Sequence, residues 1–297
     1  MTVGIIANLE KRAVKKIIPE VIAWLKKRGV DFVVEEKLAE HLNLPRHAFP
    51  RSEGKSLCRK CQMVISFGGD GTILSSARLV GRSGTPILGV KMGGMGFLAE
   101  LAPDEIYTSL EDILNGRYQT MDRMVLEARF ENDDGTERFH AVNDFVLDKG
   151  AISRVIRLKT FIDDEFLNSY IGDGVIVSTP TGSTAYSLAA GGPILIPGMD
   201  AVVINPISPH SLGARPVVIP GDKTVRVQIE EGPQEVMFSA DGQIRMMLHQ
   251  GQHVEIRKAD YTIKLVSYKG RSFYDILRAK LHWGEDVRED NRHSEPH

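Results

Sequence analysis

The stretch SFGGDGTIL, residues 66–74, places one carboxylate, Asp70, among three glycines directly after an apolar run. Residues 63–65 are typical of a buried strand, and the pattern from Thr72 onward indicates a helix start. Glycine loses more conformational entropy on folding than any other residue, so three glycines in four positions need a reason. One reason is a tight turn in which Asp70 helps to cap the helix. The other is that an anion approaches the bare backbone and Asp70 reacts beside it.

A second polar cluster, DGVIVSTPTGSTAYSLAAGGP, covers residues 173–193. An apolar run at 175–177 leads into 178–184, where five of the seven residues carry a hydroxyl group. Such a segment offers hydroxyl and backbone N–H donors at close range. A helix expected over 185–190 would add the positive end of its dipole. The alternative is an ordinary capped helix start.

Asn143 and Asp144 lie in a strand-like run, where adjacent polar residues are unusual. An asparagine can pair with an adenine edge and a carboxylate with ribose hydroxyls. A bulge in an edge strand is the alternative interpretation. The turn GGMGFLA at 93–99 contains G-x-G-x-x-A, a weak dinucleotide fingerprint for which a packing turn is the alternative, and no Walker A motif occurs.

The chain divides into two patterns. As far as about Gly116, strand-like runs alternate with helical spacing, which predicts a parallel sheet covered by helices. The strands expected there are 2–7, 32–34, 63–66 and 86–90, and the helices are 14–25 (kinked or starting late at Pro19), 73–80 and 103–114.

From about Arg123 short β runs and turns predominate, which predicts a sandwich or related all-β domain. Hairpin signals occur at 133–136 and at 163–164, and further strands are expected at 202–204, 216–219, 225–229, 254–256 and 261–266. A helix is expected at 273–281, and the polar tail beyond Trp283 is expected to be disordered.

Composition limits the class of protein. The chain has 297 residues, 42% of them hydrophobic and 26% charged, with a formal charge of −2, so it lacks a basic footprint for nucleic acid. The first apolar run is too short for a signal peptide and no later run could span a membrane, so we expect a cytoplasmic protein. Cys58 and Cys61 could form a zinc site with His41 and His47, but two reduced surface thiols are the preferred interpretation.

The motifs resemble those of NAD kinases. The segments that carry the resemblance, in chain order, are GGDG at 68–71, GFL at 96–98, ND at 143–144, TPTGSTAY at 179–186, SPHSL at 208–212 and DGQ at 241–243. GGDG alone is shared with phosphofructokinases and with diacylglycerol and sphingosine kinases, whereas the combination with TPTGSTAY is specific. The resemblance covers the chain from Thr2 to about Trp283.

The resemblance implies transfer of the γ-phosphoryl group of ATP to the 2′-hydroxyl of the adenosine ribose of NAD, giving NADP. Asp70 matches the general base of the family, and a divalent metal, Mg or Mn, would accompany ATP. No residue is assigned as a metal ligand, and whether polyphosphate replaces ATP stays open. Ile171 stands where some relatives carry a basic residue, so the choice between NAD and NADH also stays open. The residues expected to contact the substrates are Gly71, Thr72, Asn143, Asp144, Arg154, Asp173, Thr181, Thr184, Ala185, Tyr186, Ser187, Leu188, Ala189 and Gln243.

The expected architecture is an α/β N-terminal domain with a parallel sheet, followed by an all-β, sandwich-like C-terminal domain and a returning C-terminal helix. The expected boundaries are 1–122, 123–270 and 271–297, with the site in the cleft between the domains. The almost uncharged stretch 189–207 and the resemblance together predict a homodimer or homotetramer, in which Asp173 reaches into a neighbouring site. No nucleic acid or membrane partner is expected.

Overall fold

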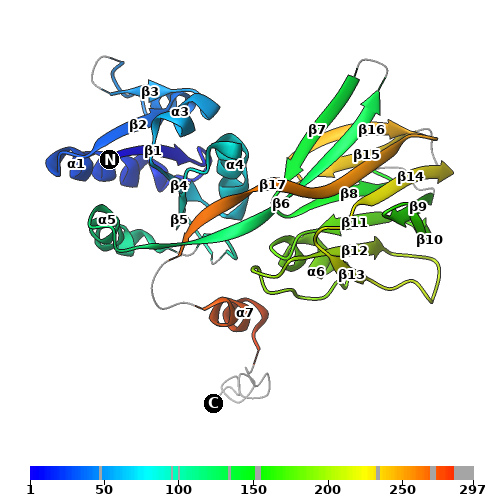
Figure 1. Ribbon diagram of the computed structural model, residues 1–297. Helices are drawn as coiled ribbons and strands as arrows, with labels where there is room; N and C mark the ends of the chain where they lie inside the picture. Colours follow the sequence, from blue (N-terminus) through cyan, green and yellow to red (C-terminus); the bar gives the residue numbers. More distant parts are fainter. Residues whose placement is uncertain are drawn as a thin grey trace, which may run out of the picture.

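The computed structural model describes residues 1–46, 49–94, 96–99, 101–132, 135–150, 155–231, 235–267 and 272–283. Two bodies lie side by side, and a pair of long strands runs from one to the other (Figure 1). The predicted fold class is confirmed: an α/β body comes first, a β sandwich follows, and a helix ends the described chain. None of the helices in the described ranges combines the length and apolar character needed to cross a bilayer.

The first body is built on a five-stranded parallel sheet in the order β5-β4-β1-β2-β3. Its strands are β1 (Thr2–Ala7), β2 (Asp31–Glu35), β3 (Arg51–Ser52), β4 (Met63–Gly68) and β5 (Ile87–Lys91). Its helices are α1 (Val14–Lys27), α2 (Glu36–His41), α3 (Gly54–Lys60), α4 (Asp70–Val80), η1 (Gly81–Ser83), η2 (Pro103–Glu105) and α5 (Ile106–Leu114). One apolar core joins α1, α2 and α5 to one face of the sheet, and a second joins α3 and α4 to the other, because alternate strand residues point to opposite faces.

The second body is a sandwich whose two sheets enclose one large apolar core. One sheet has the order β13-β12-β11-β8-β15-β16, and the facing strands are β10, β9, β14, β17, β6 and β7. The strands of this body are β6 (Gln119–Asn132), β7 (Gly135–Ala141), β8 (Asp144–Asp148), β9 (Ile156–Ile162), β10 (Glu165–Gly172), β11 (Gly174–Ser178), β12 (Ala201–Ile207), β13 (Val217–Pro220), β14 (Val225–Glu231), β15 (Glu235–Ala240), β16 (Ile244–His249) and β17 (His253–Ser267). Two short helical segments, η3 (Gly182–Thr184) and α6 (Tyr186–Ala189), follow β11.

Strands β6 and β17 connect the two bodies as an antiparallel ribbon (Figure 1). The C-terminal part of β17 pairs with β5 of the first body at Leu265, whereas its N-terminal part pairs with β14 of the sandwich. The register of the ribbon shifts between Lys258 and Thr262, so a bulge lies where the chain passes from one body to the other. The ribbon makes one continuous sheet of strands from both bodies.

Several sequence expectations need correction. The two strands expected at 254–256 and 261–266 are one strand, β17, because the bulge interrupts its alternation without ending it. Pro19 lies inside α1, which begins at Val14 and so does not start late. Helix α4 begins at Asp70, two residues before the expected start. Strands β15 and β16 were not predicted.

Cys58 and Cys61 are buried free thiols, not surface thiols. Both lie in the apolar core under α3 and α4, and burial raises the pKa of each thiol to about 11. His47 of the conceivable zinc set lies outside the described residues. Within the described ranges, no cluster of three or more His, Cys, Asp or Glu side chains is arranged to hold a metal ion.

The C-terminal helix α7 (Phe273–Leu281) coincides with its predicted bounds. Ser272 and Asp275 form a capping box at its start, and Ile276 and Leu277 are buried. Lys280 lies over the ring of Phe97, with its Nζ atom 5.0 Å from the ring centre. The helix therefore touches the second glycine turn of the first body, although the domain boundaries stay a prediction.

Candidate active site

Asp70 joins the two glycine turns of the first body. It is the first residue of α4, yet its carboxylate makes no capping bond to that helix. Instead Oδ2 accepts a hydrogen bond from Phe97 N at 2.8 Å, and Oδ1 accepts bonds from Leu98 N and Ala99 N at 3.0 and 3.2 Å. The alternative interpretation of Asp70 as a helix cap is therefore wrong, because the carboxylate points across to the turn that follows β5.

The glycines around Asp70 have two different uses. A Cβ atom at Gly68 would lie 2.0 Å from Thr72 Oγ1, and one at Gly96 would lie 2.0 Å from Asp70 Oδ1. These two glycines are required by the packing of the turns. A Cβ atom at Gly69 would meet nothing within 4 Å, and at Gly71 only the Gln243 side chain at 3.8 Å. The bare backbone there faces open space, which leaves room for a ligand to approach.

Gln243 brings the sandwich to the first turn of α4. It lies in the turn between β15 and β16, and its Nε2 atom donates to the carbonyl of Gly71 at 2.8 Å. Its Oε1 atom accepts bonds from Ser75 Oγ at 2.8 Å and from Arg78 at 2.9 Å. The predicted site residues Gly71 and Gln243, far apart in sequence, are thus in direct contact.

Asp241, in the same turn, holds the segment with Asn143 and Asp144. Its Oδ1 atom accepts from Asn143 N at 2.7 Å and Asp144 N at 3.2 Å, and its Oδ2 atom from Val142 N at 3.1 Å. Asp241 therefore accepts backbone N–H bonds from residues 142–144, just as Asp70 accepts them from residues 97–99. The sequence interpretation did not name it as a site residue. Its position before a glycine, in the segment DGQ, is the sequence signal that could have identified it. In the structure Asp241 has a φ of 50°.

Asp144 begins β8, which pairs with β11 on one side and β15 on the other. The alternative of an edge-strand bulge is therefore wrong, because β8 is an interior strand. Asp144 is 4% exposed. Burial, together with the nearby charge of Asp241, raises the pKa of its carboxyl to about 7. Among the described residues no hydrogen bond to this carboxyl group is found, so the group is free to bind hydroxyls of a ligand.

The hydroxyl-rich turn after β11 packs directly on the Asn143 segment. Thr179 Oγ1 donates to the carbonyl of Val142 at 2.6 Å, and Thr179 N donates to Asn143 O at 2.9 Å. A Cβ atom at Gly182 would lie 2.1 Å from Asn143 O, so only glycine fits there. Thr181 is buried, and its Oγ1 atom has no hydrogen-bond partner in the described structure.

The helix expected at 185–190 has only four residues, Tyr186–Ala189, so it contributes little of the expected dipole. Tyr186 is exposed beside three carboxylates; burial of part of the ring and the charges of Asp148, Asp173 and Asp144 raise the pKa of its hydroxyl. Asp173 forms an ion pair with Lys149 at 2.7 Å.

The predicted site residues thus gather along one line of contacts. Gly71, which stands between Asp70 and Thr72, contacts Gln243. The turn of Gln243 holds Asn143 and Asp144, and the segment with Thr181 and Thr184 packs on Asn143. Ala185, Tyr186, Ser187, Leu188 and Ala189 continue this segment, and Tyr186 connects it electrostatically to Asp173. Arg154 lies outside the described residues.

Comparisons with known proteins agree over most of the chain. Residues 3–118 match the model of the ATP-NAD kinase N-terminal domain, and residues 142–268 match that of the ATP-NAD kinase C-terminal domain. The chain is 40% identical over 280 residues to the NAD kinase of Caldanaerobacter subterraneus subsp. tengcongensis, covering 94% of this chain and 98% of the relative. It is 38% identical to the NAD kinase of Moorella thermoacetica, covering 97% and 91%.

Two solved structures have the same fold. Yeast NADH kinase complexed with NADH superposes with a TM-score of 0.90 at 26% identity, covering 97% of this chain and 89% of that one. An NAD kinase from Archaeoglobus fulgidus in complex with ATP superposes with a TM-score of 0.74 at 22% identity, covering 95% and 99%. The second likeness concerns the fold alone.

Proposed function

Because this chain belongs to the ATP-NAD kinase family, as its motifs predicted, we propose that it transfers the γ-phosphoryl group of ATP to the 2′-hydroxyl of the adenosine ribose of NAD, giving NADP. The observation that carries the proposal is the contact of the Gly68–Gly71 turn with the Asn143 segment through the turn of Asp241 and Gln243. This contact brings a glycine-rich turn that phosphates can approach next to residues that can bind an adenosine.

Asp70 is the proposed general base. Its Oδ2 atom accepts one backbone hydrogen bond in the described structure, so one lone pair stays available for the proton of the ribose hydroxyl. The three N–H donors of residues 97–99 fix the direction of the carboxylate. Such orientation is what a proton acceptor in phosphoryl transfer needs, since most of the catalysis lies in positioning.

The substrates are assigned by the chemistry of each segment. The bare backbone at Gly69 and Gly71 allows phosphates to come close. Asn143 suits the adenine edge, and the free carboxyl of Asp144 suits ribose hydroxyls. Thr181 keeps its proposed contact with the same dinucleotide, because its segment packs on the Asn143 segment. Arg154 keeps its proposed contact, as do Thr72, Thr184 and residues 185–189.

A divalent metal, Mg or Mn, is proposed to arrive with the donor. Magnesium that accompanies a nucleotide is typically held by substrate phosphates, water and one or two carboxylates. When bound, it neutralises charge on the phosphates. Whether the donor is ATP or polyphosphate is decided by supplying each in turn.

A homodimer or homotetramer is proposed from the exposed apolar side chains at one edge of the sandwich. Strand β13 is the edge of its sheet, with Val218 44% exposed, and Leu212, in the loop before it, is 93% exposed. Ile196 and Met199 are exposed as well, and such an edge favours association. Asp173 is proposed to reach the neighbouring site. Light scattering that shows a fully active monomer would exclude this assembly. The two buried free thiols support a reducing compartment, and we propose the cytoplasm.

The deciding experiment is incubation with NAD, ATP and magnesium, followed by measurement of NADP. A protein that only senses NAD would bind it and form no NADP, which would refute the proposal. The D70N variant should lose about 10²–10⁴ in turnover while binding NAD with nearly unchanged affinity. In either amide orientation, an NH₂ group would face a backbone N–H of residues 97–99, at a cost of about 1–3 kcal/mol in stability. Melting curves must therefore accompany the rates.

A further inference from the structure

Helix α4 begins with Asp70, and the second body contacts this helix at both of its ends. At the N-terminal end, Gln243 contacts the Gly71 carbonyl and the Ser75 hydroxyl, each at 2.8 Å. At the C-terminal end, α4 continues into η1, whose Arg82 reaches the strands of the ribbon. The helix has 11 residues and is therefore about 16 Å long, so the two contacts are well separated.

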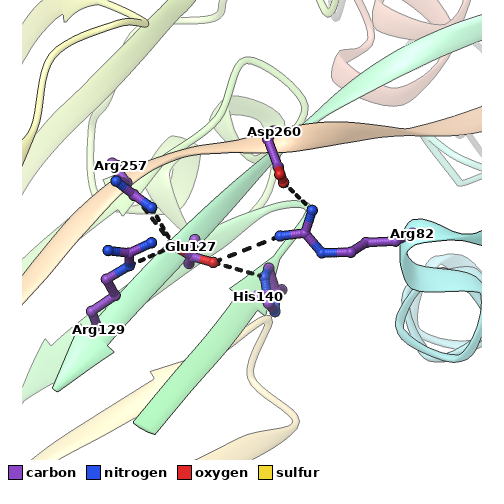
Figure 2. Close-up of polar contacts among 6 residues, drawn as sticks. All are labelled: Arg82, Glu127, Arg129, His140, Arg257 and Asp260. Atoms are coloured by element: carbon purple, nitrogen blue, oxygen red, sulfur yellow. Dashed lines mark hydrogen bonds and ion pairs between the residues drawn. The ribbon is translucent and has the colours of Figure 1, made fainter. Parts of the chain in front are cut away.

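Arg82 bridges the two strands of the ribbon, and Figure 2 shows it between two carboxylates. Its Nη1 atom pairs with Asp260 of β17, and its Nη2 atom lies 4.0 Å from Glu127 Oε2 of β6. The guanidinium group also lies over the ring of Tyr261, with Cζ 4.9 Å from the ring centre. The two nitrogens of one fork are thus directed at two different strands, and an arginine fork is rigid and planar.

Two glycines set the direction of the Arg82 side chain. Gly81 has a φ of 49° and Gly84 a φ of 69°, both in the left-handed region. A Cβ atom at either position would meet nothing within 4 Å, so backbone conformation rather than space favours glycine there. The chain leaves the path of α4 at Gly81, and the next residue is directed at the ribbon.

Glu127 is a firmly held partner, because the strands of the second body surround it. Arg257 of β17 and His140 of β7 stand opposite Glu127 in the two pairings of β6. Its Oε1 atom contacts Arg129 at 2.6 Å and Arg257 at 3.1 Å. Its Oε2 atom lies 3.4 Å from His140 and 4.0 Å from Arg82. Of these four contacting side chains, three belong to the second body and Arg82 belongs to the first.

The apolar contacts of α4 with the ribbon are of a different kind. Four residues of the helix share an apolar core with four residues of the second body: Ile73, Leu74, Ala77 and Val80 with Val125, Val142, Ala259 and Ile263. Apolar burial is non-directional, so it opposes separation of the helix from the ribbon more than sliding along it. Hydrogen bonds and ion pairs at the two ends depend on direction, so they determine where the helix lies along the ribbon.

We propose that Arg82 is a positioning residue for the reaction. Through its partners on β6 and β17, it fixes α4, and with it Asp70, relative to the second body. The effect on turnover rests on the proposed function, in which the second body holds the ribose through Asp144 and α4 supplies the base. A misplacement of about 1 Å between reacting groups can cost about 10²-fold in rate. Loosening one end of α4 should therefore slow turnover without weakening NAD binding, because the proposed adenosine contacts lie on the second body.

The first test compares the R82A variant with the wild type in steady-state kinetics. Its kcat should fall at least about 5-fold, while KM for NAD and KM for ATP stay within about twofold. Calorimetric titration with NAD should show the wild-type stoichiometry and affinity, which would exclude an unfolded fraction as the cause. The Arg82 side chain is 53% exposed, and Glu127 keeps its contacts with Arg129, Arg257 and His140, so melting should stay close to that of the wild type.

Further variants separate positioning from a general loss of charge. R82K keeps the charge and should recover part of the lost turnover, whereas the neutral R82Q should not. D260N removes a partner on the other side of the contact and should also lower kcat. R82A/D260N should lower kcat no further than R82A, because both changes remove one contact. K27A is the matched control: it removes one charge from the exposed end of α1, on the opposite face of the first sheet, and should have the wild-type kcat.

Hydrogen exchange measures the position of α4 without the reaction. In R82A, exchange should be at least about threefold faster in residues 240–246, whose turn contacts the other end of α4, as well as near η1. A change confined to η1 would show that Arg82 acts only locally.

Four results would overturn the proposal: an unchanged kcat in R82A, equal kcat in R82K and R82A, additive losses in R82A/D260N, or unchanged exchange in residues 240–246. A raised KM for ATP with unchanged kcat would also contradict it, because Arg82 would then be a ligand of the donor. A wild type that forms no NADP would refute the proposed function, and the exchange measurement would still decide whether Arg82 positions α4. The two failures are therefore distinguishable.

Discussion

Replacing Asp144 by asparagine removes a buried negative charge and keeps the shape of the side chain. Asp144 is 4% exposed, and burial together with the charge of Asp241 raises the pKa of its carboxyl to about 7. An aspartate in an unfolded chain has a pKa of about 3.9, and one pKa unit corresponds to about 1.4 kcal/mol. A rise of about three units therefore corresponds to ~4 kcal/mol.

The sign follows from proton binding in the two states. Below about pH 4 the carboxyl is protonated in both states, so it costs no stability. As the pH rises from about 4 to 7, the unfolded chain loses this proton while the folded protein keeps it, so the free energy of unfolding falls. Above about pH 7 the free energy of unfolding is lower by the full amount. The D144N variant has no charge to bury, so it should be more stable than the wild type by ~2–4 kcal/mol near pH 8.

Urea denaturation at several pH values measures this difference. The D144A variant is the control. It leaves a cavity, so its free energy of unfolding is lower than that of D144N at every pH. The difference in free energy of unfolding between D144A and the wild type should nevertheless change with pH in the same way as that between D144N and the wild type. Wild-type and D144N stabilities that stay parallel from about pH 5 to pH 8 would refute the reasoning. If Asp144 holds ribose hydroxyls, both variants should also lose roughly 10- to 100-fold in affinity for NAD and for NADP. Stability would then rise while binding falls.

Three other changes test other parts of the molecule. The G96A variant should lose turnover although Asp70 is still present, because the new Cβ would lie 2.0 Å from the Asp70 carboxylate; unchanged NADP formation would contradict the assigned geometry. E127Q should lower the free energy of unfolding by ~1–3 kcal/mol at neutral pH. Burial raises the pKa of the Glu127 carboxyl, but the hydrogen bond from Arg129 and the charges of Arg129, His140 and Arg138 outweigh burial and lower that pKa. The difference in the free energy of unfolding between E127Q and the wild type should therefore vanish as the pH falls below about 4. Denaturation at several pH values should show the two stabilities converging. Ending the chain after residue 271 removes the buried Ile276 and Leu277, and calorimetry should show Tm lower by about 5 °C or more, whereas an unchanged Tm would mean that α7 packs on nothing.

Periodicity in the sequence predicted the strands that run through a core. Strands β1, β4 and β5 and helix α7 have clear apolar spacing, and the structure has them within a few residues of the expected bounds. Burial of Cys58 and Cys61 was missed because Arg59 and Lys60 stand between them. Only the packing of α3 on β1 shows that the thiols lie on its inner side.

The contacts of the site depended on tertiary structure in a further way. GGDG predicted a reactive turn, but the partners of Asp70 are backbone N–H groups, which carry no signal of residue type. The partners of Arg82 come from β6 and β17, and no pattern in the sequence indicates that these residues lie together. The resemblance to NAD kinases predicted the candidate site residues, and the structure shows which of them are in contact.

The ribbon of β6 and β17 determines how the two bodies can move relative to each other. A flexible linker would let the two bodies rotate freely, whereas two hydrogen-bonded strands resist bending and twisting between them. The bulge of the ribbon lies near Asp260, and Arg82 of η1 contacts this region through ion pairs with Asp260 and Glu127. Any motion of one body relative to the other would therefore have to bend or twist a sheet that both bodies share.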